Sequence, residues 1–522
     1  MKTFILMLSL TLLAFSLRIY PTIISSLPFS TDSWPIIGNT KLLIENSPVN
    51  LDSPIMDGYN CYWPASSIYA STFSLVTGSN ILDGVGFSIP FAGALAVIIF
   101  YTLAYRLCGS HRISFYASAI IASSYPYTFF TAGVTKETFA SPLLMLILLL
   151  FTSKGGLKEY MLFTLASAAL VLSHHLTTLV ALTVLACTTL AQHISGFRRS
   201  EFDWKSILST AILLSSALVD FIFYAHNGFK ITLSASDILS ASSYQLLFFT
   251  LMAYTVFKPS SNSCSKNFFF MAAVSAVVTF IAMLTTVRPI LPDAPILPKY
   301  YLIYSTPYII YSALAVLGLK LKKTFHLMPM FWLSSTLALE AYSAFGSTPL
   351  GLALACRTLN FLSIPLAIFS ASGLHRLDRV KGNMLAASIL LTIVCLNIYT
   401  VYSAVSFRER YLGYFWLYSI PEYESAAWLS SYNGTVSSDV KFSYLLEGYF
   451  KVKVDVLQAL KYLSGKGCSP KVMLLYDQMS ENGYVLYGGY SVNLPEGWTR
   501  RLEGLERIYS NGQAKIFYGA RI

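Results

Sequence analysis

The chain has 522 residues, of which 55% are hydrophobic and only 12% are charged, and its mean hydropathy is +0.58. Soluble globular domains carry about 25% charged residues, so this composition excludes both a soluble globular protein and a disordered chain. The net charge of +11 would indicate a nucleic-acid-binding protein if the chain were soluble. In a membrane protein the same excess of Lys and Arg records orientation, so the position of the charges decides its meaning.

Long apolar stretches recur along the first 404 residues. A hydrocarbon core about 30 Å thick needs about 20 apolar residues per helix, and shorter helices are tolerated inside a bundle. The pattern predicts a polytopic α-helical membrane protein with about 13 transmembrane helices. The predicted spans are 3–17, 86–106, 114–131, 138–152, 159–173, 176–192, 206–223, 241–257, 267–286, 300–319, 327–345, 358–374 and 383–404. A signal peptide is the alternative for the first span, but no small-residue cleavage site precedes Arg18 and Tyr20-Pro21, which favours a retained helix.

Basic residues gather in alternate loops between these spans. If the N-terminus is cytoplasmic, the loops on that side hold sixteen basic and four acidic residues, a balance of +12. The positive-inside rule then predicts an integral, multi-pass protein of the cell membrane, and an odd number of spans places the C-terminal segment outside. The net charge therefore reflects topology, and we expect no nucleic-acid partner. The basic residues are Lys2, Arg106, Arg112, Lys154, Lys158, Arg198, Arg199, Lys205, Lys258, Lys266, Lys320, Lys322, Lys323, Arg376, Arg379 and Lys381.

From about residue 405 the sequence changes to the pattern of a water-exposed α/β domain. We therefore predict a transmembrane domain over 1–404, with a long first outer loop at 18–85, and a small extracytoplasmic α/β domain over 405–522. Asn511-Gly512 separates two short apolar runs and predicts a β-hairpin. The other predicted elements are helices at 423–431 and 457–463, a turn at 433–434, and strands at 435–440 and 471–476.

Ionisable residues near the predicted outer ends of the spans are the candidate functional residues. A charged group in or beside the bilayer is costly, so it is a functional hypothesis by default. On the predicted topology these residues face one compartment, which places any chemistry on the extracytoplasmic side. They are Asp32, Lys136, Glu137, His174, His175, Asp220, Arg288, Asp293, Glu340 and Arg357.

Each candidate also has a structural explanation. Asp32 could cap an interfacial helix, and Lys136 with Glu137 could form a solvated pair at the start of a span. The histidine pair 174–175 could occupy a wet turn without binding anything. Asp220 and Glu340 could be satisfied by backbone and hydroxyl groups inside the bundle.

Arg288 and Arg357 also have structural explanations, and the position of each residue decides how well its explanation fits. Arg288 lies beside Pro289 and Pro292, whereas ordinary contact with lipid headgroups is the structural explanation for Arg357. Arg357 opens a predicted helix, where the helix dipole disfavours a cation. A bound anion is therefore the favoured reason for a basic group at that position.

The chemistry of this set favours transfer from a lipid phosphate. Carboxylates act as general bases or hold a divalent cation, which prefers oxygen ligands. A guanidinium group matches the oxygens of a phosphate leaving group in a bidentate manner. Outward carboxylates and arginines on a membrane protein thus suit glycosyl transfer from a donor whose phosphate lies at the headgroup plane.

These features together resemble the GT-C superfamily of membrane glycosyltransferases. The similar elements are Asp32 in the first outer loop, Lys136-Glu137, His174-His175 and the stretch from Arg357 to Pro365. The thirteen-span plan with an outer C-terminal domain is similar to oligosaccharyltransferase catalytic subunits and to protein mannosyltransferases. The oligosaccharyltransferase signature Trp-Trp-Asp-Tyr-Gly is absent, and the comparable place, 436–441, keeps only Asp439. A transferase of single sugars therefore fits as well as an oligosaccharyltransferase.

The resemblance implies a role for each candidate. Asp32 would be the general base of an inverting reaction, and Glu137 a second catalytic carboxylate that holds a cation or the acceptor. Lys136, Arg288 and Arg357 would bind the phosphate, and His174 and His175 would bind a metal or phosphate. Asp220 and Glu340 remain further candidates. The implied cofactor is a divalent cation, Mg²⁺ or Mn²⁺, and the implied partners are a polyprenyl-phosphate-linked sugar, a protein, lipid or glycan acceptor, and membrane lipids.

Two other classes of protein compete with this interpretation. A transporter or lipid-linked-glycan flippase places charges near the bilayer midplane and often has inverted repeats, whereas here the charges gather at one face and no repeat is found. A structural membrane protein would use its outer domain to bind a partner and needs no converging acids and arginines. The charge pattern favours the enzyme.

Overall fold

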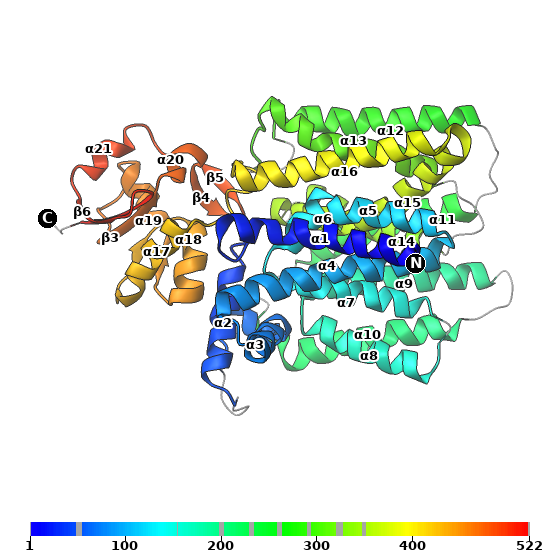
Figure 1. Ribbon diagram of the computed structural model, residues 1–522, viewed down its shortest axis with the longest axis horizontal. Coiled ribbons are helices and arrows are strands. Elements are labelled where there is room, and N and C mark those ends of the chain that lie inside the picture. Colours follow the sequence, from blue (N-terminus) through cyan, green and yellow to red (C-terminus); the bar gives the residue numbers. More distant parts are fainter. Residues whose placement is uncertain are drawn as a thin grey trace. The chain divides into compact units, whose positions relative to one another are not determined.

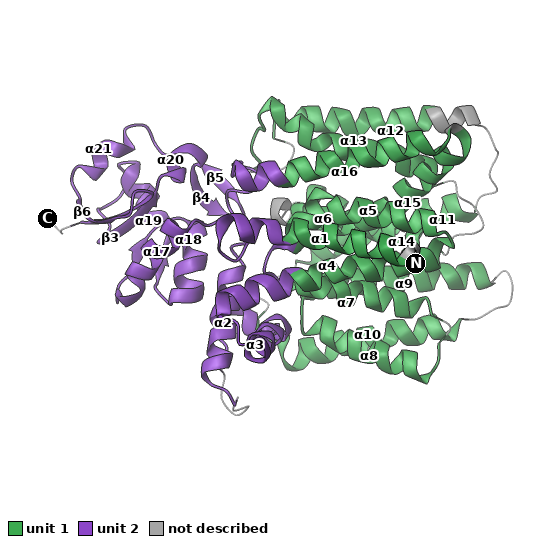
Figure 2. Ribbon diagram, in the orientation of Figure 1, with its two compact units in different colours: residues 1–18, 91–131, 136–401 green, residues 19–90, 132–135, 402–522 purple. Residues whose placement is uncertain are grey.

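A computed structural model describes residues 2–48, 55–153, 155–197, 203–228, 234–257, 264–289, 294–319, 327–346 and 351–519 (Figure 1). Asp293 and the basic residues Lys154, Arg198, Arg199, Lys258, Lys320, Lys322 and Lys323 lie outside these ranges. The chain divides into two compact units (Figure 2). Unit 1 comprises residues 1–18, 91–131 and 136–401, and unit 2 comprises 19–90, 132–135 and 402–522.

Each of the thirteen predicted spans coincides with helical structure. The helices are α1 (Lys2–Ser25), α4 (Ile81–Cys108), α5 (His111–Ser123), α6 (Tyr125–Ala132), α7 (Lys136–Phe151), α8 (Leu157–Val171), α9 (His175–Phe197), α10 (Trp204–Phe223), α11 (Ala235–Phe257), α12 (Cys264–Thr285), α13 (Leu302–Gly318), α14 (Met328–Phe345), α15 (Gly351–Lys381) and α16 (Asn383–Ser406). Among the described residues, seven helices are long and apolar enough to cross a membrane, or eight if the bent pair α6 and α7 forms one broken span. The chain is thus a polytopic α-helical membrane protein.

Two predicted spans differ in detail from the helices. The span 114–131 is broken at Ser124, whose ψ of 117° ends α5. Pro126 follows in the first turn of α6, where a missing N–H costs nothing. The first span is longer than predicted, because the helix continues through Pro21 to Ser25.

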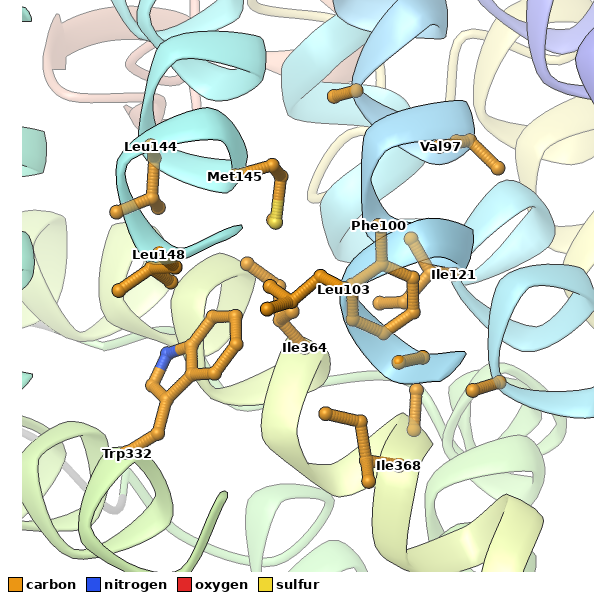
Figure 3. Close-up of a cluster of buried hydrophobic side chains, with 14 of the residues drawn as sticks. Val97, Phe100, Leu103, Ile121, Leu144, Met145, Leu148, Trp332, Ile364 and Ile368 are labelled. Atoms are coloured by element: carbon orange, nitrogen blue, oxygen red, sulfur yellow. The ribbon is translucent and has the colours of Figure 1, made fainter. Parts of the chain in front are cut away.

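Helix α15 lies at the centre of unit 1, where it packs against α5, α13 and α14. The surrounding core joins α4, α5, α7, α14 and α15 through side chains such as Phe100, Met145, Trp332 and Ile364 (Figure 3). A Cβ on Gly318 of α13 would lie 1.9 Å from the Phe369 carbonyl oxygen of α15, so the two backbones touch. Small residues permit such close helix contacts in membranes. Helix α15 is therefore held firmly, and it carries Arg357.

Unit 2 contains a five-stranded sheet in the order β2-β1-β3-β7-β6. The strands β1 (Val436–Ser437), β2 (Val454–Asp455) and β3 (Val472–Tyr476) are parallel neighbours, and β7 (Ala514–Tyr518) pairs antiparallel with β3 and with β6 (Glu506–Ser510). A separate hairpin joins β4 (Tyr484–Tyr487) and β5 (Tyr490–Val492). The helices of this segment are α17 (Ile420–Trp428), α18 (Val440–Leu445), α19 (Val456–Leu463), α20 (Gln478–Asn482) and α21 (Trp498–Leu502), with 3₁₀ or π turns at Leu429–Ser431 and Leu446–Phe450.

The predicted first outer loop contains helices of its own and folds with the C-terminal segment. It holds α2 (Ser33–Glu45), the 3₁₀ turn Tyr59–Tyr62 and α3 (Ala65–Thr77). Trp34 of α2 is fully buried, and its ring centroid lies 5.3 Å from that of Tyr418 and 5.7 Å from that of Tyr423. The interior of unit 2 is thus built from both segments.

The predicted hairpin at Asn511-Gly512 and the helix and strand at 457–463 and 471–476 are present as β6–β7, α19 and β3. The predicted strand 435–440 was too long. Its pairing ends at Ser437, because the Asp439 carboxylate accepts a hydrogen bond from the Phe442 N–H and caps α18.

Candidate active site

Four of the predicted residues meet in unit 1, where they form what we call the basic cluster: Lys136, His174, His175 and Arg357. Lys136 begins α7, His175 begins α9, and Arg357 lies in the second turn of α15. The charges of Lys136 and Arg357 act on both imidazoles, and the two imidazole centroids are 5.0 Å apart. The His174 Nδ1 is 2.7 Å from the Thr177 hydroxyl, which fixes the ring. Helix N-termini and cations together favour an anion.

Glu137 follows Lys136 of the basic cluster in the sequence. Its side chain is buried, and a residue of α15 holds it by a hydrogen bond. Its side chain is 6% exposed and accepts a hydrogen bond from the amide of Asn360. Asn360 follows Arg357 by three residues, so both project from neighbouring positions on α15. Glu137 is therefore not half of a solvated surface pair, and one helix links a carboxylate to the phosphate candidate Arg357.

Glu340, near the end of α14, accepts a hydrogen bond from the Thr358 hydroxyl of α15. This contact supports the structural explanation for Glu340. Asn360 and Thr358 were missed as site residues, although both lie in the stretch that opens with Arg357. Their spacing on one helix was the signal that could have found them.

Asp32 lies in unit 2, immediately before α2, and is partly buried. It occupies the N-cap position, but its carboxylate makes no capping hydrogen bond to α2. The preceding residues are fixed by hydrogen bonds from Ser30 N–H to the Trp416 carbonyl (3.1 Å) and from Val134 N–H to the Phe29 carbonyl (2.9 Å). Capping therefore does not account for the carboxylate.

Asp220 and Arg288 lie elsewhere in unit 1. Asp220 is half-buried on α10 between the exposed side chains of Val219 and Phe221. Arg288 is exposed just after α12. Within the described ranges, no hydrogen bond or ion pair joins either residue to the basic cluster.

The side chains around His174 and His175 bear on their predicted role as metal ligands. In the described part of the chain, no group of three or more His, Cys, Asp or Glu side chains converges in a way that could hold a metal ion. The residues present therefore do not supply a closed ligand set for a cation.

Unit 2 contains a second buried polar cluster at 436–441, the place compared with the oligosaccharyltransferase signature. Lys441 Nζ lies 2.8 Å from Glu422 Oε1 and about 5 Å from the ring centroids of Tyr414, Tyr418 and Tyr476. Burial lowers the pKa of Lys441, and the Glu422 carboxylate opposes this shift. Burial raises the pKa of Asp439 to about 6, although it accepts a hydrogen bond from the Tyr476 hydroxyl (2.8 Å). The cluster is sealed inside the domain and is structural.

No protein-family model matches the sequence, and no curated protein sequence matches it significantly. Solved structures do match. The oligosaccharyltransferase of Archaeoglobus fulgidus in its apo form has a TM-score of 0.58 at 12% identity, covering 99% of this chain and 74% of that one. The same archaeal enzyme, AglB, with an inhibitory peptide and a dolichol-phosphate has a TM-score of 0.55 at 13% identity, covering 100% and 74%. Its complex with Zn and sulfate has a TM-score of 0.55 at 13% identity, covering 98% and 73%.

The fold thus defines a class, that of polytopic membrane proteins with the GT-C fold. Within that class the chain is similar in fold to an archaeal oligosaccharyltransferase over almost its whole length. The predicted resemblance to GT-C proteins is confirmed at the level of fold.

Proposed function

We propose that this protein is a glycosyltransferase that moves a sugar from a polyprenyl-phosphate-linked donor to an acceptor at the extracytoplasmic face of the cell membrane. One observation carries the proposal: a GT-C fold in which two cations, two imidazoles and a buried carboxylate gather at the ends of α7, α9 and α15. The complex of AglB with a dolichol-phosphate supports a lipid phosphate as the donor's leaving group.

The basic cluster would bind the phosphate. Arg357 offers a guanidinium fork that pairs with two phosphate oxygens, and Lys136 adds a point charge. The imidazoles of His174 and His175 can donate N–H groups to the remaining oxygens. As the bond between the anomeric carbon and the phosphate oxygen breaks, negative charge grows on the phosphate, and preorganised cations stabilise that charge most strongly in the transition state.

Asp32 would act as the general base. Its carboxylate takes the proton from the acceptor O–H or N–H while the acceptor atom attacks the anomeric carbon from the face opposite the phosphate. The phosphate leaves with the bonding electron pair, so the configuration at that carbon inverts. The Phe29–Val134 hydrogen bond supports this role, because it fixes the segment that leads to Asp32 within unit 2.

Glu137 would orient the acceptor from its buried position, with Asn360 holding the carboxylate. A divalent cation is the alternative occupant, and the AglB complex with Zn and sulfate shows that fold in the presence of a metal. The proposed base, the phosphate-binding groups and the acceptor contact are all side chains of this chain.

The test is transfer by the purified full-length protein in lipid nanodiscs. Synthetic polyprenyl monophosphate and diphosphate sugars are supplied with peptide, lipid and glycan acceptors, and labelled product is counted. The proposal expects product from at least one pair together with release of polyprenyl phosphate. Movement of intact donor across a bilayer without cleavage would support a flippase and refute the proposal.

The variant Arg357→Gln tests the phosphate-binding role of the basic cluster directly. Losing a charged hydrogen bond to the phosphate should cost about 1.5–3 kcal/mol, and thus reduce kcat/KM for the donor by about 10- to 150-fold. Arg379→Gln is the matched control, because it removes the same group from the exposed far end of the same helix. Equal activity of the two variants would contradict the role of the basic cluster.

A further inference from the structure

A fully buried arginine near the end of α1 has no part in the chemistry described so far. Arg18 is 0% exposed, and its Nε donates to the Thr131 hydroxyl at 2.9 Å. Its Nη1 donates to the carbonyls of Ala14 (2.9 Å) and Ala122 (3.4 Å). The guanidinium carbon lies 5.3 Å from the ring centroid of Tyr127. A buried cation costs several kcal/mol in desolvation, whereas an apolar side chain would fill the same place at no such cost.

The position of this cation is specific. Ala122 lies at the end of α5, and Thr131 lies in the last turn of α6. The last carbonyls of a helix lack partners within it and carry partial negative charge. One guanidinium therefore binds a last-turn carbonyl of α5 and the Thr131 hydroxyl in the last turn of α6, just before the chain turns towards Glu137.

The turn between α6 and α7 is a sharp elbow. The two helices are bent by 119° relative to one another. The Thr138 hydroxyl donates to the Phe130 carbonyl across the elbow (3.1 Å), and the Tyr127 and Ser141 hydroxyl oxygens are 2.5 Å apart. A Cβ on Gly93 of α4 would lie 2.8 Å from the Thr131 carbonyl oxygen, so the end of α6 packs closely against the backbone of α4.

Glu137 is on the first turn of α7, directly after this elbow. The ring of Tyr127, which the Arg18 guanidinium approaches to 5.3 Å, lies in α6 on the other side of the same elbow. We propose that Arg18 is a positioning residue for Glu137: it pins the α6–α7 elbow from which the first turn of α7 begins. This inference rests on the catalytic role proposed for Glu137.

A double-mutant cycle on full-length protein in nanodiscs tests the coupling. Arg18→Met should lower kcat for transfer by about 10- to 100-fold, because small displacements of a reacting group cost that much, while the donor KM stays within about twofold. Arg18→Lys keeps the charge and should recover part of the loss. In the Glu137→Gln background, Arg18→Met should cause no further loss, because both changes remove the same contribution. Losses that multiply would overturn the proposal.

Hydrogen exchange supplies a readout that does not need transfer. Arg18→Met should speed amide exchange in peptides covering 128–141 by about tenfold or more, since exchange reports local opening, and leave α13 unchanged. Unchanged exchange at 128–141 would overturn the proposal. If Arg18→Met does not fold, Thr131→Val removes one acceptor at nearly constant volume and should shift exchange in the same direction. Wild-type exchange in Thr131→Val would then count against the proposal.

Different results would refute the catalytic role of Glu137 and the positioning role of Arg18. Full transfer by Glu137→Gln would refute the catalytic role of Glu137, while the exchange experiment would still decide whether Arg18 pins the elbow. Loss of transfer in Glu137→Gln together with full transfer by Arg18→Met would refute only the positioning role.

Discussion

Replacing Lys441 with Met tests whether the buried polar cluster of unit 2 stabilises the domain that contains Asp32. The Lys441 and Glu422 side chains are 0% and 2% exposed, and their charged atoms are 2.8 Å apart. Lys441→Met leaves the Glu422 charge buried without its cation, and breaking such a pair costs about 3–5 kcal/mol. For a unit of about 200 residues, each kcal/mol corresponds to about 2–4 °C, so the Tm should fall by about 10 °C.

The chain offers a matched control for this experiment. Lys515 and Asp477 are 2.9 Å apart, yet their side chains are 36% and 52% exposed. Lys515→Met should therefore change the Tm by no more than about 2 °C, because exposed pairs contribute about 0–1 kcal/mol.

A compensating change separates charge burial from lost packing. Glu422→Gln keeps the acceptor for the Ser419 N–H, so the double variant Lys441→Met/Glu422→Gln should recover most of the lost Tm. Thermal unfolding of the full-length protein in nanodiscs is the assay. A double variant as unstable as Lys441→Met alone, or equal effects of Lys441→Met and Lys515→Met, would refute the reasoning.

Three further predictions concern stability and the site. Burial raises the pKa of Asp439 from its ordinary value of 3.8 to about 6, so between these pH values the folded state holds a proton that the unfolded chain releases. The contribution of Asp439 to stability should therefore be fully present below about pH 4 and fall by about 3 kcal/mol as pH rises through 6, and Asp439→Asn should remove that part of the slope in denaturation measured against pH. Gly318→Ala should lower the Tm clearly, because its new Cβ would overlap the Phe369 carbonyl oxygen at 1.9 Å, whereas Gly86→Ala, with its nearest atom at 3.4 Å, should be near neutral. Glu340→Gln should retain transfer activity, since the hydrogen bond from Thr358 indicates that this carboxylate has a structural role. Loss of activity in this variant would show that Glu340 belongs to the active site.

The sequence was a good guide wherever hydrophobicity alone decides the structure. All thirteen predicted spans are helical, because a bilayer leaves the backbone no other way to satisfy its polar groups. The sequence predicted less well where a single polar contact determines the residue at which an element ends. The break at Ser124 and the early end of β1 at Ser437 depend on a local turn and on the Asp439 cap, and neither changes the hydropathy pattern.

The same contrast holds for the site. Lys136, His174, His175 and Arg357 were predicted as separate outward residues, and the structure brings them together. Asp220 and Arg288 satisfied the same criterion and lie apart, because distance along the chain and predicted side do not determine which helices are neighbours. Arg18 was not a candidate, because the predicted first span ended at residue 17, whereas the helix continues to Ser25 and contains this cation. The turn at Gly488-Gly489 between β4 and β5 was not predicted, although a Gly-Gly pair is a typical signal of a β-hairpin.

The most direct test of the central claim is the turnover of lipid-linked sugar by Asp32→Asn. This change removes the proposed base and preserves size and the N-cap position. Asp57→Asn is the matched control, because Asp57 is an exposed carboxylate of the same outer segment that pairs with Lys451 at 2.9 Å. The account predicts that Asp32→Asn folds with an unchanged Tm and transfers no detectable sugar, while Asp57→Asn transfers at the wild-type rate. Undiminished turnover by folded Asp32→Asn would contradict it.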